Sequence, residues 1–170
     1  MGLEKVVSEL NQLRADGLID SYAIGGAVAS QAYILPTSTE DVDVFVVFKG
    51  PVSLAPLGPI YAYLTARGAK IGSEDLEIGG WPVQFLPTAD PLHEEAVAQA
   101  RTNMIGVNPA RIIGLEHLAA IALQLGRPKD KLRLIEFVKV LDLTVFESLL
   151  GRFGLTEKWK QFQAQFLSEP

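Results

Sequence analysis

The stretch STEDVDVFVVF, residues 38–48, decides which fold the sequence predicts. Its second half is rich in β-branched and aromatic residues, which is typical of a buried strand. Its first half carries three carboxylates, Glu40, Asp41 and Asp43, although buried charge is costly unless a cation offsets it. Side chains alternate along a strand, so Asp41 and Asp43 point to one face, roughly 7 Å apart. Two interpretations remain open, a solvated strand end and a metal site.

A metal site of this composition favours Mg²⁺. This ion is usually bound through one or two carboxylates plus substrate phosphates, and two ions about 4 Å apart can clamp a phosphoryl transfer. Upstream, SYAIGG at 21–26 predicts a short strand that runs into two glycines, and AVASQAY at 27–33 predicts a short helix. Glycines at such a turn let the backbone approach a phosphate beside the start of a helix. An ordinary tight turn is the alternative. A Rossmann site is disfavoured because G-x-G-x-x-G is absent.

Composition limits the classes of protein to consider. The chain has 170 residues, 48% of them hydrophobic, enough for one domain or a small domain with an appendage. A net charge of −5 argues against broad non-specific binding to nucleic acid. The absence of cysteine excludes disulfides and thiol catalysis, and it suits a cytoplasmic protein. No apolar run approaches the length of about 18 residues that a transmembrane helix needs, so we expect no membrane partner.

The order of elements predicts an α/β fold of the α+β kind, with a small mixed sheet, flanking helices and a helical C-terminal part. Strands are expected at 21–24, 41–48 and 81–86, the last two as neighbours, and a hairpin at Gly79-Gly80. Segment 104–114, MIGVNPARIIG, is expected to be irregular or a short pair of strands. Helices are expected at 115–125, from Pro128 onward, and twice between 144 and 166. We therefore expect an α/β core over 1–110 and a helical part over 111–170, packed as one unit. A stripe at Trp159, Phe162 and Phe166 predicts either core or a dimer face, which leaves a homodimer open.

These motifs together resemble the nucleotidyltransferase superfamily, which has the fold of DNA polymerase beta. Its members carry a Gly-Gly or Gly-Ser turn that opens a helix, then D-x-D on the next strand. Gly25-Gly26 and TEDVD, 39–43, match that pattern. EHLAAIALQLGRPKDK, 116–131, is similar to the apolar helix and Lys-Asp motif of the bacterial branch that includes abortive-infection toxin nucleotidyltransferases. The resemblance extends from about residue 20 to 140.

The resemblance implies an enzyme that moves a nucleoside monophosphate from an NTP to an acceptor hydroxyl. Asp41 and Asp43 would be catalytic and would hold Mg²⁺ or Mn²⁺. Gly25 and Gly26 would cradle the phosphates, and Thr39 and Lys129 would contact the nucleotide. Thr39 holding the turn before the strand, and Lys129 solvated at a helix start, are the structural alternatives. The acceptor could be a small molecule, a protein hydroxyl or an RNA 3′ end.

The sequence departs from the family pattern at two positions. Thr37 stands where an arginine is frequent, and Gln84 stands where a third carboxylate completes the metal site or acts as general base. Gln84 can offer a carbonyl oxygen to a metal but cannot take a proton near pH 7. Glu77 and Asp90 are candidate substitutes. The alternatives are therefore a degenerate nucleotidyltransferase that binds a nucleotide or a partner without chemistry, or a scaffold with incidental carboxylates. His93 is expected at the surface near a helix start.

Overall fold

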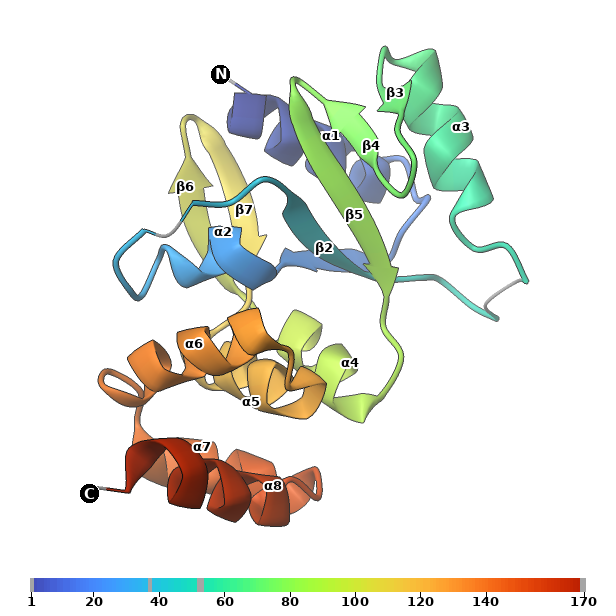
Figure 1. The fold of residues 1–170 in the computed structure, drawn as a ribbon. Coiled ribbons are helices and arrows are strands. Elements are labelled where there is room, and N and C mark those ends of the chain that lie inside the picture. The colour runs from blue at the N-terminus through green and yellow to red at the C-terminus, as the bar shows by residue number, and fades with distance from the viewer. Residues whose placement is uncertain (1, 37, 52–53, 169–170) are drawn as a thin grey trace.

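The sheet is mixed and is built around β2. In the computed structural model, which describes residues 2–36, 38–51 and 54–168, the strand order is β3-β4-β5-β2-β1-β7-β6 (Figure 1). β1 runs antiparallel to β2, whereas β5 runs parallel to it. The strands described are β1 (Ser21–Ile24), β2 (Val42–Val47), β3 (Lys70–Ile71), β4 (Leu76–Ile78), β5 (Trp81–Pro87), β6 (Arg101–Ile105) and β7 (Asn108–Ile112).

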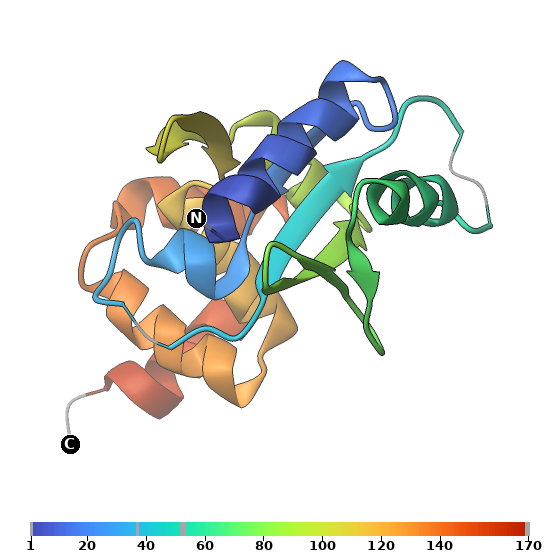
Figure 2. The same ribbon diagram turned by 90° about the horizontal axis from the view of Figure 1, so that it is seen from above.

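One face of the sheet is covered by the N-terminal helix. Val42, Val44 and Val46 alternate along β2 onto this face and are fully buried, as expected for a strand of period two. α1 (Gly2–Ala15) crosses this face (Figure 2). Its first residue, Gly2, lies close to the Trp81 ring. Its own apolar stripe, Val6, Val7, Leu10 and Leu13, is fully buried. α3 (Gly58–Ala66) lies beside β3, and Arg67 directly after it pairs with the buried Glu9 of α1 at 2.6 Å.

The other face carries Asp43 and Phe45 and meets three helices. α2 (Gly26–Ser30) and α4 (Pro91–Ala98) contact β2, and α5 (Leu115–Leu125) packs against both of these helices. α6 (Pro128–Val138), α7 (Leu143–Arg152) and α8 (Thr156–Phe162) complete a helical layer below the sheet (Figure 1). α5 contacts each of these three helices and is therefore the centre of the layer. A π-helical turn, Gln163–Leu167, continues α8.

The aromatic stripe near the C-terminus belongs mainly to the core of this layer. Trp159 packs edge-on against Phe146, with ring centroids 5.1 Å apart, and stacks on Phe162 at 5.9 Å. Trp159 and Phe162 are buried, whereas Phe166 is 37% exposed. Burial within the same chain accounts for most of this stripe, so it offers no argument for a dimer.

Most sequence predictions for the elements are confirmed, with small differences at the ends. β2 and β5 are neighbours as predicted, and segment 101–112 forms the strand pair β6–β7 rather than irregular chain. α2 ends at Ser30 instead of residue 33, because the chain continues in turns toward Pro36. β3 was not predicted. It is only two residues long, and both are exposed. No helix within the described ranges is long and apolar enough to cross a membrane.

Candidate active site

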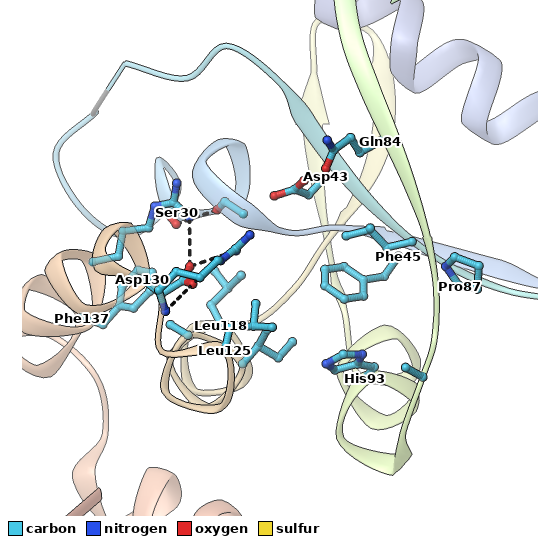
Figure 3. A pocket seen from close by; sticks show the side chains of 17 residues that line it. Ser30, Asp43, Phe45, Gln84, Pro87, His93, Leu118, Leu125, Asp130 and Phe137 are labelled. Atoms are coloured by element: carbon cyan, nitrogen blue, oxygen red, sulfur yellow. Dashed lines mark hydrogen bonds and ion pairs between the residues drawn. The ribbon is translucent and has the colours of Figure 1, made fainter. Parts of the chain in front are cut away.

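Asp43 and Gln84 lie side by side at the centre of the candidate site (Figure 3). They are register partners on β2 and β5, as the predicted strands require. Asp43 is half-buried, and its carboxylate makes no hydrogen bond or ion pair with any other described residue. Burial raises the pKa of Asp43, and the charge of nearby Asp41 raises it further; three basic side chains at α6 lower it in part. This carboxylate therefore sits where a further cation would be favourable.

Asp41 lies directly before β2 and faces a different part of the site. The hydroxyl of Thr39 donates to the Asp41 carbonyl at 2.8 Å, so Thr39 does hold the turn before the strand. Both residues also line a polar cavity of about 500 Å³, together with Lys129. The structure therefore brings three of the predicted site residues, Thr39, Asp41 and Lys129, to one cavity. Thr37 lies outside the described residues.

The glycine turn is required by its close approach to β2. The Gly25 N–H donates to the Asp43 carbonyl at 2.9 Å, which ties the turn to the strand. Gly26 has a φ of 56°, in the left-handed region that glycine tolerates best. A Cβ at Gly26 would also collide with a carboxylate oxygen of Asp43. α2 has only five residues, so the positive charge expected at its start is small, and the turn acts mainly by bringing backbone close to Asp43.

The start of α6 supplies the positive charge of the site. Arg127 precedes the helix and donates to Asp130 through Nε at 2.6 Å and through Nη2 at 3.2 Å. The Asp130 side chain is only 3% exposed and also accepts from the Arg127 backbone N–H at 3.3 Å, which forms a capping box. Arg133 lies 3.8 Å from the same carboxylate. Arg127 thus donates to both carboxylate oxygens of Asp130. Arg133 is close enough for an ion pair only, so its N–H groups can donate to a ligand.

Each of the two aspartates lines a different cavity, Asp41 the polar one and Asp43 an apolar one. The polar cavity lies on the side from which the chain enters β2, where residues 38–41 form one wall. The apolar cavity, of about 290 Å³, lies between the sheet and α2, α4, α5 and α6. In Figure 3, Asp43, Gln84 and Phe45 form its upper wall, and Leu118 and Leu125 lie opposite. Arg133 lines both cavities.

The same architecture occurs in solved structures of nucleotidyltransferases. A crystal structure of an antigenic nucleotidyltransferase-like protein from Paracoccidioides brasiliensis matches with a TM-score of 0.61 at 16% identity, over 98% of this chain and 97% of that one. A crystal structure of ANT(2″)-Ia in complex with adenylyl-2″-tobramycin gives 0.51 at 16% identity, over 95% and 97% of the two chains. A solution structure of the antibiotic-resistance factor ANT(2″)-Ia gives 0.50 at 19% identity, over 98% and 92%.

The chain has the nucleotidyltransferase fold. The predicted resemblance is thereby confirmed at the level of the fold. No protein-family model and no curated protein matches the sequence at a significant level. At such low identities the likeness establishes architecture, so the chemistry must be argued from the site itself.

The donor set of this nucleotidyltransferase fold suits a hard divalent cation held by few ligands. Asp41 and Asp43 offer carboxylate oxygens, and the amide oxygen of Gln84 is of the type that Mg²⁺ accepts. No cluster of three or more His, Asp or Glu side chains able to hold a metal occurs among the described residues. A nucleotide phosphate would have to supply further oxygens.

The two carboxylates suggested as substitutes for the missing base are engaged elsewhere. Glu77, on β4, pairs with Lys70 at 3.3 Å. Asp90 caps α4 by accepting from the His93 N–H at 3.0 Å, and it accepts from the Gln124 side chain at 2.7 Å. Hydrogen bonds from His93 and Gln124 more than offset burial and lower the pKa of Asp90. Neither residue lines the apolar cavity that contains Asp43, so neither is placed to act as the base.

The prediction that His93 lies at the surface is wrong. His93 lines the apolar cavity, with its side chain only 12% exposed. Its ring packs edge-on against Phe45, with centroids 5.2 Å apart. His93 is buried because of the way α4 is rotated against the sheet. The spacing of apolar residues in an eight-residue helix does not reveal that rotation.

Sequence reasoning also missed Arg133 and the burial of Asp130. The helical spacing of Lys129 and Arg133, four residues apart, places both on one face of α6, and that spacing could have identified Arg133. The burial of Asp130 carried no such signal, since Asp at the third position of a helix is usually a solvated favourable charge.

Proposed function

We propose that this protein is a Mg²⁺-dependent nucleotidyltransferase that moves a nucleoside monophosphate from an NTP to an acceptor hydroxyl. The observation that carries the proposal is the Asp43 carboxylate. It is half-buried and unpaired among described residues, it lies against the Gly26 turn, and basic side chains face it. A structural carboxylate would normally be satisfied by protein partners, whereas a metal ligand need not be.

Asp41 and Asp43 would hold Mg²⁺ or Mn²⁺, with a weaker contribution from Gln84. The bound ion would neutralise phosphate charge and favour departure of pyrophosphate. Gly25 and Gly26 would admit the phosphates close to the backbone, and Thr39 and Lys129 would contact the phosphates from the polar cavity. Gln84 would orient the acceptor hydroxyl by hydrogen bonding, without removing its proton.

The amide at Gln84 favours a second candidate, a degenerate nucleotidyltransferase that binds nucleotide without turnover. Both candidates predict Mg²⁺-dependent NTP binding, and only the first predicts turnover. The acceptor, whether a small molecule, a protein hydroxyl or an RNA end, is not specified by this choice. The cysteine-free composition supports a cytoplasmic location as part of the proposal.

Thermal unfolding with each NTP, with and without Mg²⁺, tests nucleotide binding. A ligand at about 100 times its Kd stabilises the folded state by about 2.7 kcal/mol. We expect this stabilisation only with Mg²⁺, and we expect Asp41→Asn and Asp43→Asn to abolish it. Asp20→Asn, an exposed aspartate outside both cavities, is the matched control. A Mg²⁺-dependent shift that survives both site variants would contradict the proposal, and so would its absence in the native protein.

Turnover of NTP labelled at the α-phosphate then distinguishes an active enzyme from a degenerate nucleotidyltransferase that only binds nucleotide. Release of labelled monophosphate onto an acceptor, or exchange of pyrophosphate into NTP, supports the enzyme. Binding without either reaction supports the non-catalytic module.

A further inference from the structure

The apolar cavity next to Asp43 contains no free negative charge apart from the proposed metal site. Its titratable lining residues are Asp43, His93, Arg127, Asp130 and Arg133. Asp130 is held by both oxygens in its pair with Arg127 and has Arg133 nearby. When Asp43 binds the metal ion, the other charged side chains that line the cavity are Arg133 and the Arg127–Asp130 ion pair. None of them offers an unpaired carboxylate.

Most of the wall is apolar. Phe45 and Leu86 continue the Asp43 and Gln84 face of the sheet, and Leu118, Ile121 and Leu125 of α5 face them. The volume of about 290 Å³ is close to the lower bound of about 300 Å³ for pockets that enclose drug-sized ligands. The cavity therefore suits a small apolar group.

The position of the cavity relative to Asp43 indicates which substrate it receives. In phosphoryl-group displacement the attacking and leaving oxygens lie roughly in line. Thr39, Lys129 and Arg133 line the polar cavity beside Asp41, and these are groups that bind phosphate. Glu40 and Glu136 also line it, so a phosphate there would have to bind on the side of Lys129 and Arg133. A metal ion held by both aspartates would lie between the cavity of Asp41 and the cavity of Asp43. If the leaving pyrophosphate lies in the polar cavity, the apolar cavity is left for the attacking hydroxyl.

We propose that the apolar cavity is the acceptor subsite and that it takes an uncharged hydroxyl compound with a small apolar body. The proposal rests on the nucleotidyl transfer proposed above. In the step, the acceptor oxygen forms a bond to the α-phosphorus, and the bond from that phosphorus to the β-phosphate oxygen breaks. Pyrophosphate leaves, and the hydroxyl proton goes to solvent water.

A network around His93 adds a polar contact to this subsite. Asp90 accepts from the Gln124 amide nitrogen at 2.7 Å, which fixes the amide orientation and makes its oxygen the acceptor toward His93 Nε2 at 2.9 Å. Neutral His93 then carries its proton on Nε2 and keeps Nδ1 as an acceptor. Because the Phe45 ring lies between His93 and Asp43 (Figure 3), His93 is placed to recognise the acceptor body rather than to act as base.

The same lining disfavours a polycationic acceptor. Such a ligand would need unpaired carboxylates to replace the water lost from each ammonium group, whereas two arginines face the cavity. An uncharged aromatic alcohol such as 2-naphthol fits the lining, and the polycation tobramycin does not.

Isothermal titration of the full chain with 2-naphthol and with tobramycin tests the proposal. The variant is Leu125→Glu, which puts a carboxylate at the cavity wall, and the matched control is Leu143→Glu on α7. The two leucines are 47% and 46% exposed, and only Leu125 lines this cavity. We expect saturable 2-naphthol binding that Leu125→Glu weakens about tenfold or more, a change of at least ~1.4 kcal/mol. Leu143→Glu should leave that binding unchanged, and tobramycin should not bind the native chain.

A second titration includes Mg²⁺ and a non-hydrolysable analogue of the NTP that gives the largest thermal shift. Binding of 2-naphthol together with the nucleotide supports an acceptor subsite, and competition between them overturns it in favour of a nucleobase site. Equal 2-naphthol affinity in the two variants, or tight binding of tobramycin, also overturns it. These failures would leave Mg²⁺-dependent nucleotide binding intact. If instead the native chain binds 2-naphthol but does not bind the nucleotide analogue with Mg²⁺, the proposed nucleotidyl transfer is overturned. The acceptor role of the cavity is then overturned with it.

Discussion

At the scale of single residues, Gly26 should be the least replaceable glycine of the site. Alanine there would have to adopt a φ of 56° and would collide with the Asp43 carboxylate. The left-handed conformation alone costs roughly 1–2 kcal/mol, so we expect Gly26→Ala to lower the free energy of unfolding by about 2 kcal/mol or more. Urea denaturation measures this loss. Gly58→Ala is the control, because it begins α3 with open space around it, and it should be neutral or slightly stabilising.

Gln84 decides at the same scale between an enzyme and a relic. Gln84→Asp places a carboxylate beside Asp43, its register partner, in a site whose burial already raises the pKa of Asp43. The metal-free variant should therefore unfold at lower temperature, and Mg²⁺ should offset that loss by binding the folded state. If the native protein lacks a base, transfer should rise by up to roughly 10²- to 10⁴-fold, the usual contribution of general base catalysis. Gln84→Glu controls for charge with a longer side chain. An unchanged Mg²⁺ affinity in both variants would show that residue 84 does not face the metal.

At the scale of elements, one carboxylate joins three helices. Glu95 of α4 accepts from Arg152 of α7 at 2.7 and 2.8 Å and lies 3.0 Å from Nε2 of His117 on α5. Hydrogen bonding from Arg152, then from His117, lowers the pKa of Glu95 from 4.5 to about 2 despite some burial. Because the folded-state pKa is lower than the unfolded one, this contribution to stability is complete above about pH 4.5. It is lost as the pH falls toward 2.

Glu95→Gln should therefore reduce stability at pH 7 and matter little near pH 2. Since Arg152 is 54% exposed, we expect a loss of about 1 kcal/mol, at the upper end for solvent-exposed pairs. Urea midpoints measured from pH 7 down to pH 2 give the profile. The neighbouring Glu94→Gln is the control, because Glu94 is exposed and has no ion pair with a described residue. A loss independent of pH would indicate a packing defect instead of the ion pair.

Sequence predicted the elements better than it predicted the contacts between them. The pairing of Asp43 with Gln84 was predictable, because alternation fixes the faces of β2 and β5 and the family pattern requires them to be neighbours. The second cation of the site, Arg133, and the cavity position of His93 depend on how α6 and α4 rotate against the sheet. Side chains on distant elements decide those rotations, so local periodicity did not contain them.

At the scale of the whole molecule, the helical part is joined to the sheet by more than its linking chain. β7 pairs with β1 through Ile24 and Ile112, and the Ile113 N–H donates to the Ile24 carbonyl at 3.0 Å directly before α5 begins. α5 then packs against α2 and α4 on the sheet side and against α7 and α8 on the far side. We therefore propose that the core at 1–110 and the helical part at 111–170 unfold as one unit.

The two tryptophans allow this proposal to be tested, because Trp81 lies in β5 and Trp159 lies in α8. In Trp159→Phe the remaining fluorescence reports on the sheet, and in Trp81→Phe it reports on the helical layer. If α5 couples the two parts, the fluorescence transition of each variant should coincide with its own loss of far-ultraviolet circular dichroism, as expected for two-state unfolding. Comparison within each variant removes the effect of the substitution on stability. A Trp159 signal that is lost well before the circular dichroism of the same variant would show that the helical layer unfolds independently.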